Sequence, residues 1–149
     1  MKLTGDEREL LMTEVAQALD HVRAPEMRVT YGELLSAVDQ GEIPDDLLPP
    51  LETVLEIGLQ SGRVRKVHLA PGETAARRLY ARTPKGKALQ GATDEVNEAL
   101  RALKGHVVEE ISISQPIPGS FSLLVETEYG KLQLRLDRDG VRLQSLEVG

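Results

Sequence analysis

Residues 63–87 read RVRKVHLAPGETAARRLYARTPKGK, and the fold that the whole chain predicts depends on this stretch. It carries eight basic side chains and one acidic side chain, although the 149-residue chain has a formal net charge of −6. Two runs of β character, residues 63–69 and 77–82, flank the segment APGETAA, whose Pro-Gly pair is typical of a turn. The pattern predicts a β-hairpin with a long tip.

Three helices are predicted before this hairpin. The first begins at a capping box formed by Thr4 and Glu7 and ends before Pro25, because the residue that precedes a proline avoids helical backbone angles. A short strand over residues 27–30 comes next, followed by a short helix over residues 30–41 that opens at a second capping box. The third helix starts near residue 50, and its predicted buried stripe consists of Leu51, Val54, Leu55, Gly58 and Leu59.

A further helix is predicted after the hairpin. It begins with Thr83 as N-cap and Pro84 at the first helical position, and it ends before Gly105. From residue 106 onward the apolar period changes to two, which predicts strands at residues 107–114, 120–128, 131–137 and 141–148.

The C-terminal strands are predicted to form a half-buried antiparallel sheet. Leu132, Leu134 and Leu136 share one face of their strand, and an Asp-Gly pair before the last strand is typical of a tight hairpin. Residues 114–121, SQPIPGSF, are predicted to be a rigid loop, and the loss of alternation near residues 144–145 predicts a bulge. The expected fold is therefore α+β, with a winged helix-turn-helix domain over residues 1–105 and a four-stranded antiparallel β unit over residues 106–149.

The order helix, short strand, helix, helix, hairpin, helix is the order of winged helix-turn-helix domains. Over approximately residues 27–90, the sequence LLPPLETVLEIGLQSGRVRKV…RRLYARTPKGKAL resembles the third helix, wing and post-wing segment of PadR-like and MarR-like transcriptional regulators. The resemblance rests on a leucine-rich helix with a Gly-Leu pair and on the pattern Y-x-x-T-x-x-G at Tyr80, Thr83 and Gly86. It implies a DNA-binding transcriptional regulator.

The basic stretch is the predicted DNA-binding site, because cations along a wing neutralise backbone phosphates and release condensed counterions. Two alternatives stay open. The cations could be solvated or pair with the acidic helices of the same chain, or they could dock an acidic protein partner. The predicted DNA-binding residues are Arg63, Arg65, Lys66, Arg77, Arg78, Arg82, Lys85 and Lys87.

The third helix disfavours base recognition. Its side away from the buried stripe carries Glu52 and Glu56, and two glutamates are repelled by a phosphate-lined groove. The alternative function is therefore a winged-helix protein-interaction module whose basic wing binds an acidic partner and which does not bind DNA.

Enzymatic motifs are missing from the sequence. The three histidines form no H-x-x-x-H pair, no Ser lies in a nucleophile-elbow pattern, and the lack of cysteine excludes disulfides and thiolate metal sites. We expect no catalysis, no metal and no cofactor.

No apolar run is long enough to span a bilayer and no secretory signal is recognisable, so we expect a cytoplasmic protein that does not bind membranes. An edge strand of the sheet could pair with a second chain, which predicts a homodimer.

Overall fold

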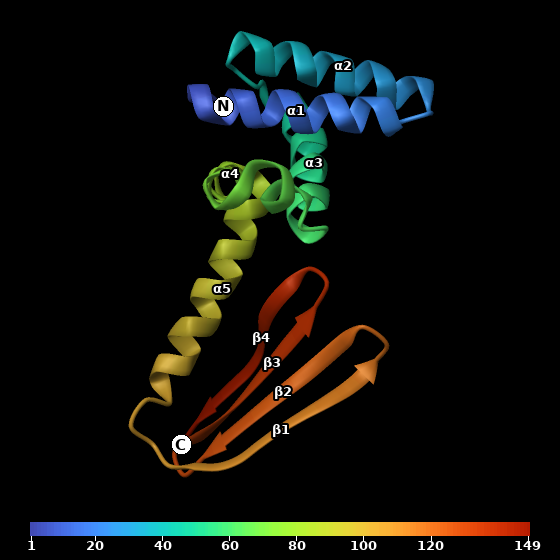
Figure 1. Cartoon of the computed structure of the whole chain (residues 1–149). Helices are drawn as coiled ribbons and strands as arrows, with labels where there is room; N and C mark the ends of the chain where they lie inside the picture. The colour runs from blue at the N-terminus through green and yellow to red at the C-terminus, as the bar shows by residue number, and fades with distance from the viewer. The chain divides into compact units, whose positions relative to one another are not determined.

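The computed structural model describes residues 1–149 as a mixed α+β chain (Figure 1). It forms two compact units, Met1–Gly86 and Lys87–Gly149. The helices are α1 (Gly5–His21), α2 (Pro25–Gln40), α3 (Leu48–Gln60), which follows a 3₁₀ turn η1 (Asp45–Leu47), α4 (Arg63–Arg82) and α5 (Pro84–Ala102). The strands are β1 (Val108–Ile117), β2 (Ser120–Thr127), β3 (Gly130–Asp137) and β4 (Gly140–Val148).

The first unit is helical, with α1 and α2 side by side and α3 crossing them (Figure 1). The predicted capping box of α1 is confirmed: the Glu7 N–H donates to Thr4 Oγ1 at 3.3 Å, and the Thr4 N–H donates to Glu7 Oε2 at 2.9 Å. The predicted stripe of α3 is also confirmed, since its Leu51, Val54, Leu55 and Gly58 are buried. The core of this unit is built mainly from leucine and valine of the first four helices.

The short strand predicted at residues 27–30 is wrong, because α2 is continuous from Pro25. Pro25 occupies the first turn, where its fixed φ suits a helix and its missing N–H costs no hydrogen bond. Thr30 is not an N-cap: its hydroxyl donates to the Glu26 carbonyl at 3.2 Å, one turn back within the helix.

The predicted wing is also wrong, because residues 63–82 are helical and contain no strand. The helix has a kink at Leu69, whose φ of 60° and ψ of −166° are non-helical, and Pro71 lies in the first turn of the segment that follows. Val64, Ala76 and Leu79 bury their side chains in the core of the unit. Helical geometry brings these three side chains onto the core, which a hairpin with alternating sides would not do.

The joint between α4 and α5 explains the pattern Y-x-x-T-x-x-G. Thr83 is the predicted N-cap of α5: its hydroxyl donates to the Tyr80 carbonyl at 2.8 Å and accepts from the Gly86 N–H at 3.1 Å. A Cβ on Gly86 would lie 1.9 Å from the Tyr80 carbonyl oxygen. The three residues that carry the family resemblance therefore form a compact helix junction.

The second unit contains the predicted four-stranded antiparallel sheet, with strand order β1-β2-β3-β4. The predicted bulge is confirmed, because Gln133 pairs with Ser145 and Leu134 with Leu143, which leaves Gln144 as the extra residue. The predicted loop over residues 114–121 is wrong: β1 continues to Ile117, and the turn is confined to the two residues before β2. The irregular pairing between Ser114 and Ile117 accommodates the proline of that stretch.

Helix α5 covers part of one face of this sheet. Its Val96 and Ala99, with Leu103 directly after it, are buried in one cluster with Leu132 and Leu134 of β3. The boundary between the two compact units therefore precedes most of α5, whereas the sequence-predicted boundary followed residue 105.

Candidate functional site

The eight predicted DNA-binding residues lie on α4 and at the start of α5, and four carboxylates of the chain form ion pairs with five of them. Arg63 pairs with the buried carboxylate of Glu14. The other four pairs are Arg65–Glu73 at 3.2 Å, Arg77–Glu73 at 2.5 Å, Arg82–Glu7 at 2.9 Å and Lys85–Glu56 at 2.7 Å. The structure thus agrees with the alternative in which the basic stretch pairs with acidic groups of the same chain.

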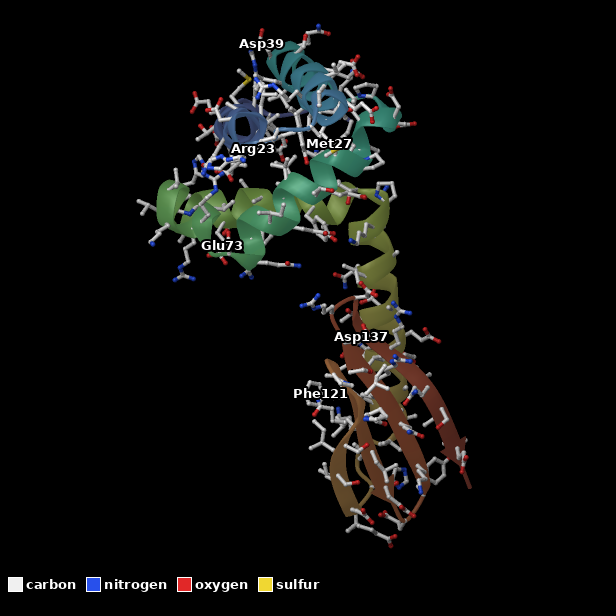
Figure 2. All side chains as sticks on the ribbon, turned by 90° about the vertical axis from the view of Figure 1, so that its right-hand side faces the viewer. Arg23, Met27, Asp39, Glu73, Phe121 and Asp137 are labelled. Atoms are coloured by element: carbon white, nitrogen blue, oxygen red, sulfur yellow. The ribbon has the colours of Figure 1, made fainter.

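Three of the predicted cations, Lys66, Arg78 and Lys87, form no ion pair, and all three are exposed. Arg65 and Arg77 keep 72% and 70% of their side-chain surface exposed despite sharing Glu73, the labelled carboxylate of α4 in Figure 2. Such exposed pairs are weak and are screened by salt. Part of the positive charge of α4 therefore remains accessible from solvent.

The two glutamates of α3 bond to the α4–α5 joint instead of facing a nucleic acid. Glu52 Oε1 accepts the Lys85 backbone N–H at 2.8 Å, and Glu56 Oε1 accepts the Tyr80 hydroxyl at 2.6 Å. Burial alone would raise the pKa of Glu56, but hydrogen bonds from Lys85 and Tyr80, with the Lys85 charge, outweigh it and hold that pKa below its ordinary value. Burial and the same hydrogen bond from the phenol to Glu56 raise the pKa of Tyr80.

A buried carboxylate organises the other end of α4. Glu14 is 1% exposed, and it accepts from the guanidinium of Arg63 and lies 2.8 Å from His68 Nε2. His68 thus contacts a buried carboxylate from a helix, whereas the predicted hairpin would have placed it on a strand over residues 63–69. The three residues come from α1 and α4, and they tie the first turns of α4 to α1.

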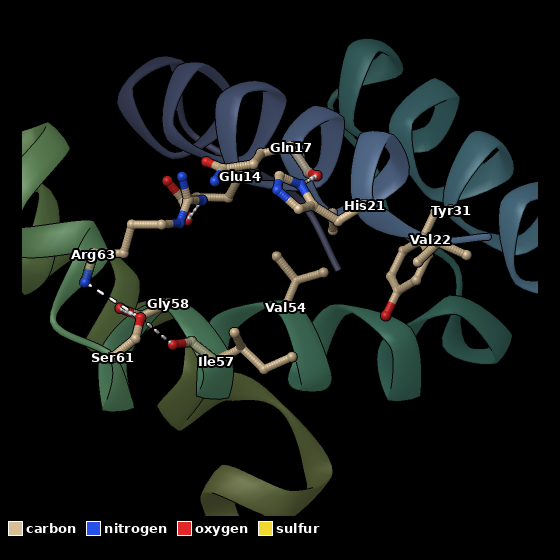
Figure 3. Close-up of a pocket in the computed structure, with 11 residues that line it drawn as sticks. Glu14, Gln17, His21, Val22, Tyr31, Val54, Ile57, Gly58, Ser61 and Arg63 are labelled. Carbon is tan, nitrogen blue, oxygen red and sulfur yellow. Dashed lines mark hydrogen bonds and ion pairs between the residues drawn. The ribbon is translucent and has the colours of Figure 1, made fainter.

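A groove lies between α1 and α3 and ends at Arg63 (Figure 3). It has a volume of about 450 Å³, within the range of sites that bind small molecules or side chains. Its walls are mainly apolar and include Ala18, Val22, Val54 and Ile57, with Ile57 62% exposed.

Polar side chains also border this groove, where Arg63 pairs with Glu14 and the Ser61 hydroxyl donates to the Ile57 carbonyl. His21 Nδ1 donates to the Gln17 carbonyl at 2.8 Å, which leaves Nε2 without a hydrogen-bond partner in the chain. Tyr31 lines the end away from Arg63 (Figure 3), and its hydroxyl forms no hydrogen bond. Burial raises the pKa of Tyr31. The phenol is therefore a neutral donor at neutral pH, and the groove combines aliphatic walls with the Arg63–Glu14 ion pair at one end and a hydroxyl at the other.

Sequence analysis missed Glu14 and Tyr31, although the signals were present. Glu14 follows Leu10 and Leu11 at helical spacing, so a carboxylate interrupts an apolar stripe. Tyr31 precedes Leu34 by three residues, which is helical spacing, but the predicted helix began with Thr30 as N-cap and so placed Tyr31 at its first residue. No single residue type marks the groove itself, because its walls come from separate helices.

Comparisons with protein-family models, curated proteins and solved structures found no match for this chain. The resemblance to PadR-like and MarR-like regulators stays a prediction. None of the five helices combines the length and apolar character that crossing a membrane requires.

Proposed function

We propose that this chain is a non-catalytic, cytoplasmic protein-interaction module that binds an acidic, aliphatic segment of a partner protein and does not bind DNA. The observation that carries the proposal is the groove between α1 and α3, an apolar channel with an exposed isoleucine and the Arg63–Glu14 ion pair at its end. Aliphatic side chains of a partner would occupy the walls, and its carboxylates would lie near Arg65 and Lys66.

The charges beside the groove support an acidic partner. Arg63 donates to Glu14 through one nitrogen, and a guanidinium has five N–H donors, so others are available to a ligand. Arg65 and Lys66 follow Arg63 on the first turns of α4, and both are exposed. Glu14 lines this end of the groove and pairs with Arg63, so the positive charge for a ligand carboxylate comes from the exposed Arg65 and Lys66, while an aliphatic side chain is buried against Val54 and Ile57.

The test is a selection of binding peptides from a random library displayed on phage, followed by fluorescence anisotropy with the selected peptides. We expect peptides that combine aliphatic residues with Asp or Glu, and an affinity at least about tenfold lower for Ile57→Glu, which replaces an aliphatic contact by a repelling charge. Val29→Glu is the matched control, because Val29 on α2 is 62% exposed, as Ile57 is, and does not line the groove. Selected peptides that bind Ile57→Glu as tightly as the unchanged chain would contradict the proposal.

DNA binding is the second candidate function, and the observation that favours it is the accessible positive charge of Lys66, Arg78 and Lys87. On this proposal the chain is a transcriptional regulator in which α3 and α4 contact DNA without a wing. The predicted helix-turn-helix and the resemblance to PadR-like and MarR-like regulators remain predictions, and both bear on this second candidate alone.

Fluorescence anisotropy with random-sequence duplex DNA at several salt concentrations separates the two candidates. Phosphate contacts by α4 would give a slope of log K against log salt of about −3 to −6. Replacing Arg77 and Arg78 together by alanine would make that slope shallower by about 2, since each lost contact contributes about 0.9. No measurable binding at low salt is the result that the interaction module predicts.

A further inference from the structure

Strand β1 is an uncovered edge of the sheet. It pairs only with β2, so the backbone groups on its outer side have no strand partner. All ten of its residues are exposed, and Ile111 and Ile113 are 64% and 66% exposed. Natural edge strands are usually shortened, covered, or protected by charged side chains, proline or bulges, and in β1 such features lie on either side of residues 111–114, as Glu109, Glu110, Pro116 and two irregular pairings. No Lys or Arg lies in residues 107–117, and the central pairing with β2, from Glu110 to Ser114, is regular.

The isoleucines of β1 extend the apolar face on which α5 packs. Ile111 lies opposite Val125 and Ile113 opposite Leu123, and Leu123 in turn lies opposite Leu134 of the core. Residues directly opposite in an antiparallel pair share one face of the sheet. Helix α5 buries its own apolar residues on β3, so the same face stays open over β1. Phe121 of β2, labelled in Figure 2, adds to this open face and is 42% exposed.

We propose that two copies of this chain associate through β1, antiparallel and centred on Ser112, and so form one continuous eight-stranded sheet. The argument is that β1 is self-complementary in one register. Centring on Ser112 places Ile111 opposite Ile113 of the second copy, twice by symmetry. The remaining opposite pairs are Val108–Pro116, Glu109–Gln115, Glu110–Ser114 and Ser112–Ser112, so no two carboxylates oppose each other.

Other registers lose this complementarity. Centring on Ile111 places Ile113 opposite Glu109 of the second copy, and centring on Ile113 places Ile111 opposite Gln115. A shift by one residue places isoleucine opposite serine and turns the apolar face of the second copy to the other side of the sheet. The registers centred on Ile111 or Ile113 also join the two apolar faces, but only the register centred on Ser112 places both isoleucines of each copy opposite isoleucines.

The first test is the molar mass in solution, measured by sedimentation equilibrium. The full chain is expected to be a dimer, and Ile113→Glu is expected to be a monomer with the same circular dichroism spectrum, because Ile113 is exposed in the single chain. Val29→Glu, which changes a similarly exposed aliphatic residue of the first unit outside the groove, should remain a dimer. A monomeric full chain at every concentration, or a dimeric Ile113→Glu, would overturn the proposal. Peptide binding in the groove is measured separately, so failure of either proposal leaves the other standing.

The second test fixes the register by oxidation of single cysteines, which is possible because the chain has none of its own. At the centre of the pair, Ser112→Cys would place two Cα atoms about 4.5–5.5 Å apart, within the range of a disulfide. Ser114→Cys is the control, because its copies would lie about 13 Å apart along the strands. We expect a disulfide-linked dimer for Ser112→Cys and little for Ser114→Cys. Equal cross-linking of both variants, or more with Ser114→Cys, would overturn the register.

Discussion

Replacing Glu14 by glutamine should destabilise the helical unit by about 2–3 kcal/mol. Glutamine keeps the volume of the side chain but removes the charge that Arg63 and His68 share, and it turns one of two acceptors into a donor. Removal of one partner from a buried ion pair costs about 3–5 kcal/mol, because the other charge is left buried. The Arg63 side chain is 25% exposed, so water solvates part of its charge and the lower value applies.

Urea unfolding followed by circular dichroism at neutral pH measures this loss. Glu98→Gln is the control, since the Arg101–Glu98 pair on α5 has both side chains more than 70% exposed and should contribute about 0–0.5 kcal/mol. Removing Glu14 and Arg63 together should cost no more than removing Glu14 alone, because the orphaned cation is then absent. A loss for Glu14→Gln as small as that for Glu98→Gln would show that this buried cluster does not stabilise the unit.

Three further predictions concern the same unit and its junction with α5. Gly86→Ala should lower the free energy of unfolding in urea by about 2–3 kcal/mol, because its Cβ would lie 1.9 Å from the Tyr80 carbonyl oxygen. Gly91→Ala is the control: the space around Gly91 is open, so the alanine should stabilise α5 by about 0.5–1 kcal/mol. Leu69→Gly should raise the free energy of unfolding by about 1 kcal/mol, because a positive φ strains leucine but suits glycine, and the leucine side chain is 67% exposed. Unchanged or lower thermal stability would contradict the inference that the backbone is strained at Leu69. Because the pKa of Glu56 is lowered, its contribution to the free energy of unfolding is present above the ordinary pKa of 4.5 and is lost as the pH falls through the folded-state pKa. Glu56→Gln should therefore lose less stability than the unchanged chain between neutral pH and about pH 3.5. Equal acid sensitivity of the two proteins would refute this role of Glu56.

Local chemistry alone determined a large part of this structure. The capping box at Thr4, the Thr83–Pro84 helix start and the two-residue period of the last strands each depend on residues that are near in the sequence. The bulge at Gln144 was visible for the same reason, because a single extra residue breaks the alternation of a strand. Such signals operate over a few residues, so they are present before the chain is folded.

Residues 63–82 show where local signals fail. Of the residues buried there, only Ala76 and Leu79 have helical spacing, because Val64 lies twelve residues before Ala76 and the kink at Leu69 separates them. Packing against the core of the first unit selects the helix, because that geometry buries all three side chains. Tertiary context overrode a weak local preference for strand.

The charge pattern shows the same division for the candidate site. The sequence by itself determined that positive charge is concentrated in residues 63–87 of an acidic chain. Only the tertiary structure decided which cations remain accessible, because the carboxylates of Glu7 and Glu14 meet Arg82 and Arg63 from 75 and 49 positions away in the sequence. The groove and the open edge of β1 also depend on how separate elements pack, since each is a surface that neighbouring helices leave uncovered.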